Sequence, residues 1–559
     1  MVRATFSGFN TALSALQANQ KRLDITGQNL SNMNTAGYTR QQLEASSLNY
    51  TNPVSHYSNG NETAVGFGVS MNRVSQIRDP YLDIQYRSQS ADCSYTNRLQ
   101  TALNSLSKVL DETTISGIRQ AFDDVQSTLT SMQDPAKVSD PIYESELRTK
   151  MQSVCNLFNQ ASRQITQAEQ NEFQRLTGEG SSEQGDVQKI NDILRQIGDL
   201  NVQIKRNQVA GHPSLELQDE RNLLLDELSG YIPVETRYYK DDAHSGNNAY
   251  DYDANGAVIG KKDWPDDLEV SMNYIDAKGK SQKLILVNGS DLGAKGLTKN
   301  YGQLSVLKGN DHQAAASVSD PANISIKFEK APSYKGNGQA AADVYAELKG
   351  IHFEGGSLQA SLDMLQKTGT GNVINGSTAV DDVRGYQYYS KKLDQLASTF
   401  ADSMNDINNK GKNPKDQNLL SNSTDDSTNG ITAGNIGISK GWTSGTIHIS
   451  TDGTNRTDTI LDMIAAMKDT KKLNGKTFAD YMNNLSTQLA SDSSSNQTAL
   501  KTGTTVLNSI QDSRDSLSGV SLDEEATNMM AYVSAYNAAS RLMTALDEVL
   551  NTLISNTGA

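Results

Sequence analysis

A short run near the middle of the chain comes closest to a known chemical motif. Asp251, Asp253 and Asn255, followed by Gly256, have the spacing of the first half of an EF-hand calcium loop. The position that should supply a bidentate carboxylate is Lys262 instead, and no helical pattern flanks the loop. The stretch from Tyr250 to Gly260 is therefore predicted to form a hairpin, and no metal site is expected there.

Other residue types that carry catalysis are too scattered to form a recognisable site. No pair of histidines has the spacing of a zinc site; they are His56, His212, His244, His312, His352 and His448. The chain has neither a G-x-x-x-x-G-K phosphate loop nor a G-x-S-x-G nucleophile elbow. We therefore expect no catalytic residue, no cofactor and no metal ion, and we predict that the protein is not an enzyme.

The acidic balance of the chain argues against nucleic acid as a partner. The 559 residues carry a net charge of −15, with a pI near 5.0, and no cluster of Lys and Arg supplies a basic face. A hydrophobic content of 36% and a mean hydropathy of −0.56 favour about three or four domains in an elongated molecule. No apolar window is long enough to cross a membrane, and the start lacks the apolar region of a signal peptide. Cys93 and Cys155 are expected to be small buried residues rather than a disulfide framework.

The strongest periodicity lies at the C-terminus. Apolar residues recur every seven positions in one series, Leu522, Met529, Tyr536, Met543 and Leu550, and in a second series, Tyr532, Ala539, Leu546 and Leu553. Val533 and Ile554 widen this seam, and Ser521 with Glu524 forms a capping box at its start. The pattern predicts one helix of about 33 residues. An isolated helix of this kind is marginal in water, so it needs a partner.

A second seven-residue repeat lies at the opposite end of the chain, from about Thr5 to Leu30. Its main series is Phe9, Leu16, Leu23 and Leu30, with Phe6 and Leu13 three positions before the first two. We expect the two terminal helices to bury each other as a coiled coil. The alternative is that each helix packs against its own nearest domain.

The run from Asn29 to Arg40 follows the first repeat and predicts a turn, because Asn and Gly tolerate left-handed backbone. Within it, five positions match the N-terminal signature of the bacterial flagellar rod, hook and hook-associated proteins: Asn29, Asn32, Thr35, Gly37 and Tyr38. The run from Ser521 to Ala538 resembles the other signature of this family. The chain is thus similar to the flagellar axial proteins at both ends.

The middle of the chain reads as several helices. They are expected from Pro80 through Leu110, from Ser116 to Met132, from Pro141 to about Leu176, from Ile190 to Ile204, from Leu215 to Leu228, from Leu393 to Gly411 and from Leu461 to Leu489. A Ser-rich stretch, Ser491–Ser495, is expected to separate the last of these from the C-terminal helical region. The segments 116–135, 217–229 and 393–411 resemble the hook-associated members of the family. A hook protein or other axial subunit is the alternative.

Strand-like runs interrupt the helical pattern. Glu269–Met272, Leu284–Val287 and Ile324–Phe328 predict an inserted β domain, with further strands around Val65–Val74 and over Asn435–Ser450. The expected fold is multidomain and mainly α: a terminal coiled coil, a helical-bundle middle domain and a β-rich outer domain. The expected boundaries are 1–55 with 505–559, then 56–235 with 356–504, then 236–355.

The resemblance implies a structural role in the bacterial flagellum. It implies a junction protein that joins hook to filament, is needed for flagellin assembly, and leaves the cytoplasm through the flagellar secretion channel. The implied partners are copies of the chain in a tubular ring, hook protein on one side, and a second junction protein and then flagellin on the other. An export chaperone would bind the C-terminal helix, and neither nucleic acid nor membrane would be a partner. The two seams would be assembly interfaces. An axial protein whose region 236–355 is enzymatic or adhesive remains a different hypothesis.

Overall fold

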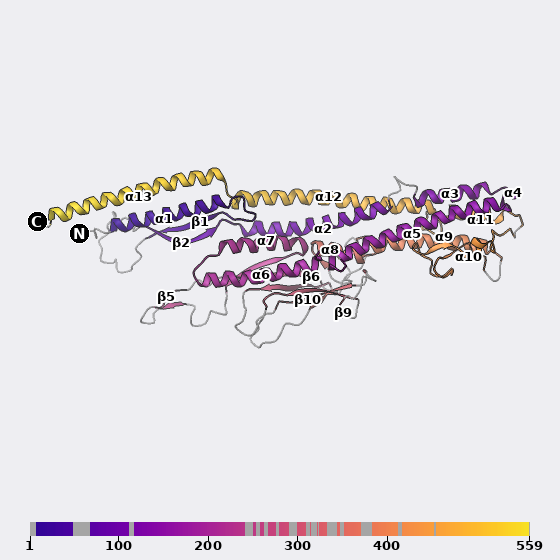
Figure 1. The fold of residues 1–559 in the computed structure, drawn as a ribbon, viewed down its shortest axis with the longest axis horizontal. Coiled ribbons are helices and arrows are strands. Elements are labelled where there is room, and N and C mark those ends of the chain that lie inside the picture. Colours follow the sequence, from indigo (N-terminus) through magenta and orange to yellow (C-terminus); the bar gives the residue numbers. More distant parts are fainter. Residues whose placement is uncertain are drawn as a thin grey trace.

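The chain folds into an elongated molecule whose long helices run along its longest axis (Figure 1). This computed structural model describes residues 7–48, 68–110, 117–180, 182–240, 250–252, 258–261, 266–275, 279–289, 299–308, 313–314, 321, 324–331, 344–346, 352–369, 383–411, 416–451 and 454–557. The sheets are small and antiparallel. The expectation of a mainly helical protein with some β structure is confirmed.

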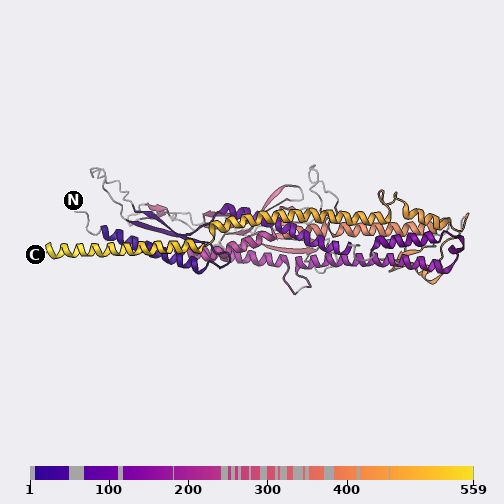
Figure 2. The same cartoon turned by 90° about the horizontal axis from the view of Figure 1, so that it is seen from above.

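Both ends of the chain lie at the same end of the molecule (Figures 1 and 2). Helix α1 spans Ser7–Ser31, helix α13 spans Leu522–Thr557, and the two helices pack side by side. α1 also packs against a sheet made of strands β1 (Gln41–Ser47) and β2 (Val69–Gln76). We call these four elements the terminal unit. β2 overlaps the strand expected around Val65–Val74, whereas β1 was missed because its mainly polar residues show no apolar alternation.

Two long helices, α2 (Pro80–Leu110) and α12 (Phe478–Ser518), pack along each other through the middle of the molecule. Part of their contact is polar, since Gln100 Nε2 donates a hydrogen bond to Ser493 Oγ at 2.7 Å. The prediction that Ser491–Ser495 separates two helical regions is wrong, because these residues lie inside α12. Packing against α2 overrides the low helix propensity of serine here.

The end of the molecule far from the termini is a helical bundle around an aromatic core. It contains α3 (Ile118–Ser131), α4 (Pro135–Val138), α5 (Pro141–Thr177), α9 (Tyr386–Asn408) and α11 (Asp458–Lys468). The ring centroids of Phe122 and Phe400 lie 5.2 Å apart, and Phe158 and Phe478 pack against them. The start of α5 was predicted from Asp140 followed by Pro141. In the structure, the Asp140 side chain caps the helix by accepting a hydrogen bond from Ile142 N at 2.9 Å.

One segment of this bundle differs from its prediction. The β structure expected over Asn435–Ser450 is reduced to strand β14 (Ile436–Ile438), which pairs with β13 (Leu420–Asn422). A short helix, α10 (Lys440–Ser444), follows directly and buries Trp442 completely. The apolar alternation continues in the sequence, but burial of this large ring decides the local structure.

Three more helices connect the bundle to the β region: α6 (Asp186–Val209), α7 (Leu215–Tyr231) and α8 (Ser357–Gln366). One sheet has the order β12-β6-β3, with β7 also paired to β6; these strands are β3 (Glu235–Lys240), β6 (Asp266–Ile275), β7 (Ser281–Asn288) and β12 (His352–Phe353). A second sheet has the order β11-β10-β8-β9, namely β8 (Gln303–Lys308), β9 (Gln313–Ala314), β10 (Ile324–Glu329) and β11 (Val344–Ala346). The predicted strands are present in β6, β7 and β10.

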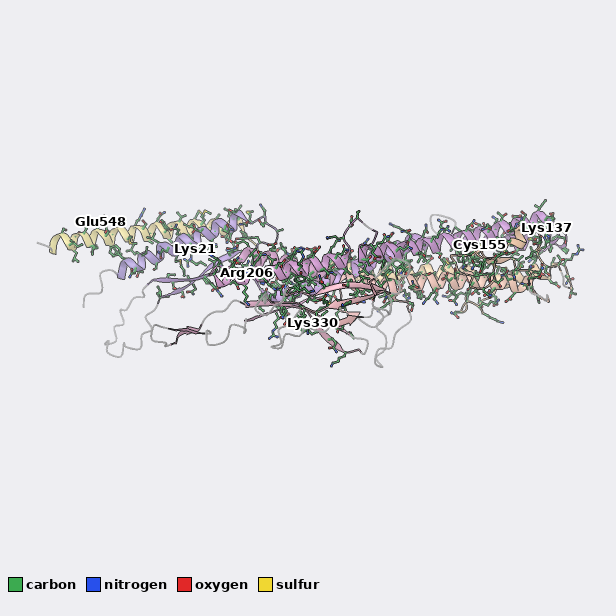
Figure 3. All side chains as sticks on the ribbon, turned by 60° about the horizontal axis from the view of Figure 1, so that its bottom comes forward. Lys21, Lys137, Cys155, Arg206, Lys330 and Glu548 are labelled. Carbon is green, nitrogen blue, oxygen red and sulfur yellow. The ribbon has the colours of Figure 1, made fainter. Side chains whose placement is uncertain are left out.

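The candidate calcium loop and the two cysteines have the structures that the sequence predicted, as far as the described residues extend. β4 (Tyr250–Tyr252) pairs with β5 (Val258–Lys261) in the expected hairpin, whose turn lies outside the described residues. Both cysteines are free and buried, as predicted, and Cys155 lies among the helices of the bundle (Figure 3). Burial raises the pKa of the Cys155 thiol to about 12. None of the helices in the described ranges combines the length and apolarity needed to cross a membrane.

Candidate functional site

The two terminal helices meet through residues that repeat every seven positions. A Cβ atom added to Gly8 of α1 would lie 3.3 Å from Cδ1 of Leu546 of α13. The Arg22 guanidinium lies 5.6 Å from the centre of the Tyr532 ring, in a cation–π contact. Because residue numbers rise along α1 as they fall along α13, the helices are antiparallel.

On α1, the contacting row lies one position before the row expected from the sequence. The expected residues Phe9, Leu16, Leu23 and Leu30 are half-buried, Leu13 is 45% exposed, and Phe6 lies outside the described residues. Successive residues of a helix are turned by about 100°, so the expected row lies beside the contact with α13. The row that contacts α13 begins with Gly8, which lets Leu546 approach closely. A heptad search selects large apolar residues and therefore does not detect this row.

On α13, the second predicted series faces α1. Tyr532 and Leu546 make the contacts above, Ala539 is 8% exposed, and Leu553 is 50% exposed. The first series is less covered: Met529, Met543 and Leu550 are half-buried, whereas Leu522 and Tyr536 are 51% and 36% exposed. A single chain therefore covers neither series completely and leaves the first the more exposed.

The uncovered rows of the two helices lie on the same side of the pair. The row on α1 is reached by moving one residue forward from the contacting row, a rotation of about 100°. On α13, the uncovered first series lies three residues before the second series, which contacts α1. Three residues back is a backward rotation of about 300°, which equals a forward rotation of about 60°, in the same sense as on α1. In an antiparallel pair, rotations of the same sense lead to the same side. The pair thus presents one joint apolar face that this chain leaves partly open.

Asn29, the first residue of the turn signature, links the end of α1 to both β1 and α13. Its Oδ1 accepts hydrogen bonds from the Tyr38 hydroxyl at 2.9 Å and from Gln41 N at 3.0 Å. Its Nδ2 donates to the Gln41 carbonyl at 3.0 Å and to Glu525 Oε2 at 3.4 Å. Asn29 is 1% exposed, so every polar atom of its side chain needs a partner.

The remaining signature residues form the turn itself. Asn32 Nδ2 donates to the Gln28 carbonyl at 3.0 Å, and Thr35 Oγ1 donates to Asn32 Oδ1 at 3.3 Å. Gly37 has a φ of +75°, a conformation that favours glycine. Burial, together with nearby carboxylates, raises the pKa of Tyr38, so its hydroxyl remains a donor to Asn29.

Arg40 joins this turn to the start of α13. Its Nε and NH1 atoms donate to Glu525 Oε1 and Glu524 Oε2, both at 2.8 Å. Glu525 is 2% exposed, and Arg40 N also donates to the Ser518 carbonyl at 2.9 Å. The Glu524 side chain is thus engaged by Arg40, while Glu524 N lies 3.5 Å from Ser521 Oγ, the predicted cap.

The turn also rests on α7. Asp219 accepts hydrogen bonds from Thr39 N at 3.1 Å and from Thr39 Oγ1 at 2.6 Å. Burial raises the pKa of the Asp219 carboxyl to about 6, although the bonds from Thr39 lower it in part. A Cβ atom on Gly37 would lie only 2.4 Å from Cγ of Leu223. The first half of α7 therefore fits closely under the signature turn.

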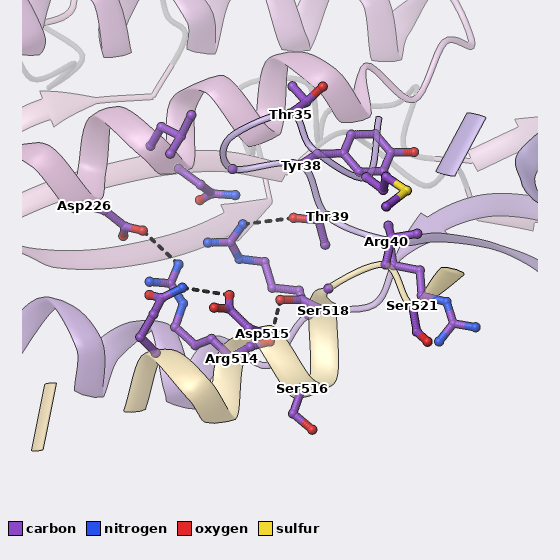
Figure 4. A pocket seen from close by; sticks show the side chains of 18 of the residues that line it. Thr35, Tyr38, Thr39, Arg40, Asp226, Arg514, Asp515, Ser516, Ser518 and Ser521 are labelled. Carbon is purple, nitrogen blue, oxygen red and sulfur yellow. Dashed lines mark hydrogen bonds and ion pairs between the residues drawn. The ribbon is translucent and has the colours of Figure 1, made fainter. Parts of the chain in front are cut away.

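A pocket of about 810 Å³ opens where the turn, α7 and the end of α12 meet. Figure 4 shows Thr39 and Arg40 on the turn, with Arg514 of α12 directed toward Asp226 of α7. The distance from Arg514 NH2 to Asp226 Oδ2 is 2.8 Å, and Arg78 is bonded to Asp83. Since these cations have carboxylate partners within the chain, the arrangement has the chemistry of a structural joint. Among the described residues, no group of three His, Cys, Asp or Glu side chains could hold a metal ion.

The sequence did not single out Arg40, Asp219, Arg514 or Glu525 as parts of this joint. Arg40 and Glu525 lie within the two signature runs, and Asp219 lies within the segment 217–229; these positions were the available signals. Their contact joins residues 485 positions apart, which no local pattern reveals.

Comparisons with known proteins match both terminal helices and the middle of the chain. A family model described as the flagellar hook-associated protein FlgK helical domain matches residues 103–256. Models of the flagella basal body rod protein and of the flagellar basal body rod FlgEFG protein C-terminal match residues 9–39 and 513–556. The chain is 28% identical over 570 residues to flagellar hook-associated protein 1 of Bacillus subtilis, covering 99% of both chains. The chain is thus similar to flagellar hook-associated protein 1 over nearly its whole length.

Two further comparisons differ in how much of each chain they cover. Flagellar hook-associated protein 1 of Escherichia coli is 24% identical over 592 residues, covering 98% of this chain and 99% of that protein. A solved structure of the flagellar hook junction protein FlgK from Burkholderia pseudomallei gives a TM-score of 0.37 at 18% identity, covering 61% of this chain and 44% of that one.

The matching models and the relatives similar over the whole chain are all named as flagellar proteins. The rod-protein matches cover α1 with its turn and α13, whereas the FlgK helical-domain match covers α7. The contact between Thr39 and Asp219 therefore joins a part shared with rod proteins to a part characteristic of FlgK.

Proposed function

We propose that this protein is a non-catalytic subunit that joins the flagellar hook to the filament and is needed for flagellin assembly. The observation that carries this proposal is the joint apolar face of α1 and α13. Both helices come from opposite ends of the chain, yet their pairing leaves large apolar side chains exposed beside one another.

Coverage by further copies of the chain explains why this face stays apolar. Fully burying one large apolar side chain contributes about 1.5–3 kcal/mol. Leu13, Leu522 and Tyr536 remain 45%, 51% and 36% exposed, so a neighbour would recover part of this energy at several positions. A head-to-tail contact between identical subunits closes into a ring or extends into a tube. The predicted seam residues are therefore proposed assembly interfaces.

The proposed partners follow from this position in the flagellum. Copies of the chain form the ring, with hook protein on one side and a second junction protein, then flagellin, on the other. The chain leaves the cytoplasm through the flagellar secretion channel, and an export chaperone binds α13 beforehand. Exposed apolar residues on the second half of α13 support this last point: Leu542, Val549 and Ile554 are 49%, 63% and 62% exposed.

The same proposal assigns a role to each expected part. Residues 1–55 with 505–559 form the inner part of the assembly, 56–235 with 356–504 form the helical middle, and 236–355 form an outer β-rich part. Position 505 lies inside α12, so this helix would continue from the middle into the inner part.

A strain lacking this chain tests the proposal. We expect it to build hooks, to bear no filaments and to release flagellin into the medium, and we expect the full-length chain to restore filaments. Normal filaments in the deletion strain would refute the junction role. Complementation with Leu13→Asp should fail, whereas Asn10→Asp, at an exposed position of α1 outside both rows, should succeed. The amount of each variant in the medium separates a loss of assembly from a loss of export.

A further inference from the structure

Helix α7 occupies a position that the junction role alone does not explain. Its Leu217–Ser229 segment distinguishes this chain from hook proteins in sequence, yet it lies outside the terminal helices. It runs beside α2 and α6, close to where the terminal unit begins (Figure 1). Its first half touches the terminal unit, and its other faces touch the rest of the molecule.

Covalently, the terminal unit is joined to the rest of the chain at only two places. One is Ile77–Asp79, between β2 and α2, and the other is Gly519–Ser521, between α12 and α13. Two short connections allow bending unless other contacts oppose it. Gly519 and Ser521 also line the pocket of about 810 Å³, so there is open space beside the second connection.

The contacts that oppose bending come mainly from the first half of α7, beside one backbone hydrogen bond from Arg40 N to the Ser518 carbonyl of α12 at 2.9 Å. Asp219 is 6% exposed and receives two hydrogen bonds from Thr39, and the Leu215 carbonyl accepts one from Gln76 Nε2 at 2.9 Å. Leu223 lies directly beneath Gly37, so the turn cannot move closer. The hydrogen bonds therefore hold the turn against α7, and Leu223 limits how closely it can approach.

The other faces of α7 are tied to the body of the molecule. Asp226 accepts hydrogen bonds from Arg87 of α2 and Arg514 of α12, both at 2.8 Å. Arg221 NH1 donates to Asn201 Oδ1 of α6 at 2.8 Å, and Asn201 Nδ2 donates to the Leu268 carbonyl of β6 at 3.2 Å. Arg221 and Asn201 are buried, so these bonds are shielded from water.

We propose that α7 sets the direction in which the paired terminal helices leave the body of the molecule, with Asp219, acting through Thr39, as the positioning residue. The turn carries the orientation onward, because Asn29 and Arg40 hold β1 and α13 to it. Without the contact to α7, the terminal unit remains folded but pivots about its two connections. This inference concerns the geometry of the single chain and goes beyond the junction role.

Spin-label distances in the full-length chain test the inference. Cys93→Ala and Cys155→Ala remove the native thiols, and Gln20→Cys on α1 with Thr505→Cys on α12 place labels at exposed sites on either side of the joint. The parent protein should give one narrow distance distribution. Asp219→Ala should broaden it at least twofold, Thr39→Val should broaden it less because the backbone bond remains, and Thr39→Ser should restore the narrow form. Glu220→Ala, the next carboxylate on α7 but exposed, should leave it unchanged.

Hydrogen exchange of α2 and α12 in each variant shows whether the body remains folded. If Asp219→Ala loses this protection, the comparison of Thr39→Val with Thr39→Ser decides. A broad distribution in the parent, or a narrow one in both Asp219→Ala and Thr39→Val, would overturn the inference. Neither result bears on whether the chain joins hook to filament, which the deletion strain tests separately.

Discussion

Replacing Asn29 with alanine removes the side chain on which the signature turn is built. The substitution deletes two bonds accepted by Oδ1 and two donated by Nδ2. It leaves the amide and carbonyl of Gln41, the Tyr38 hydroxyl and one oxygen of Glu525 without this partner in a buried setting. Asn29 is 1% exposed, so water cannot replace the amide without a local opening.

The expected loss of stability follows from those groups. A buried polar group left unsatisfied costs about 1–3 kcal/mol, and costs within one network do not add fully. Two of the four partners are backbone atoms of β1 and cannot turn elsewhere. We therefore expect Asn29→Ala to lower the free energy of opening of the terminal unit by about 2–4 kcal/mol. Since about 1.4 kcal/mol is a factor of ten, exchange in β1 should accelerate roughly 30- to 1,000-fold.

Amide hydrogen exchange measured by mass spectrometry, on peptides covering β1 and the first turns of α13, provides the assay. Asn32→Ala is the matched control, because Asn32 is less buried and its side chain contacts only the turn and the end of α1. We expect the control to change exchange less than tenfold. The reasoning fails if Asn29→Ala alters exchange no more than Asn32→Ala does, or if the acceleration spreads equally to the distant bundle.

Three further predictions follow from the same region. Gly37→Ala should destabilise the turn by about 1–3 kcal/mol, because its φ is +75° and the new Cβ would meet Leu223; adding Leu223→Ala should recover part of the loss in thermal unfolding. Burial raises the pKa of Asp219 to about 6, so its protonation favours the folded state. The stabilising contribution should be present below about pH 4 and disappear as the pH rises through about 6. Asp219→Asn should flatten that part of the melting-temperature profile. Finally, Leu13→Asp with Tyr536→Asp should leave the melting temperature of the single chain within about 2 °C, since both residues are at least 36% exposed, yet abolish filaments in motility and electron-microscopy assays.

Periodicity identified the terminal helices but not the exact row in contact. Both seven-residue repeats lie in helices, and residues of the second series of α13 contact α1. On α1, the row with Gly8 and Arg22 makes the contact instead of the row with Phe9 and Leu23. A heptad pattern reports where apolar side chains gather. It does not show whether they face a partner within the chain or remain open beside it.

Local chemistry predicted the helix boundaries better than the irregular segments. Asp140 before Pro141 marks the start of α5 because capping depends only on neighbouring residues. The prediction of a break at Ser491–Ser495 was wrong because packing against α2, which the local sequence does not show, keeps these residues helical. Burial of Trp442 in α10 is likewise a tertiary effect, which alternation of neighbouring isoleucines cannot show.

Only one part of the joint, the signature turn, could be predicted from the sequence. The signature residues between Asn29 and Tyr38 indicated a turn, and the structure has one. Their partners Asp219 and Glu525 are distant in sequence, and acidic residues are common throughout this chain. Which carboxylates are buried against the turn depends on the tertiary fold.

The pairing of first helix with last also sets an order of events during synthesis. Asn29 and Glu525 are separated by 496 positions, so α1 leaves the ribosome long before its partner exists. At about 5–20 residues per second, that interval is roughly 25–100 s. Throughout this interval, the middle of the chain can fold while α1 has no partner helix, and the pair closes only after α13 has been translated.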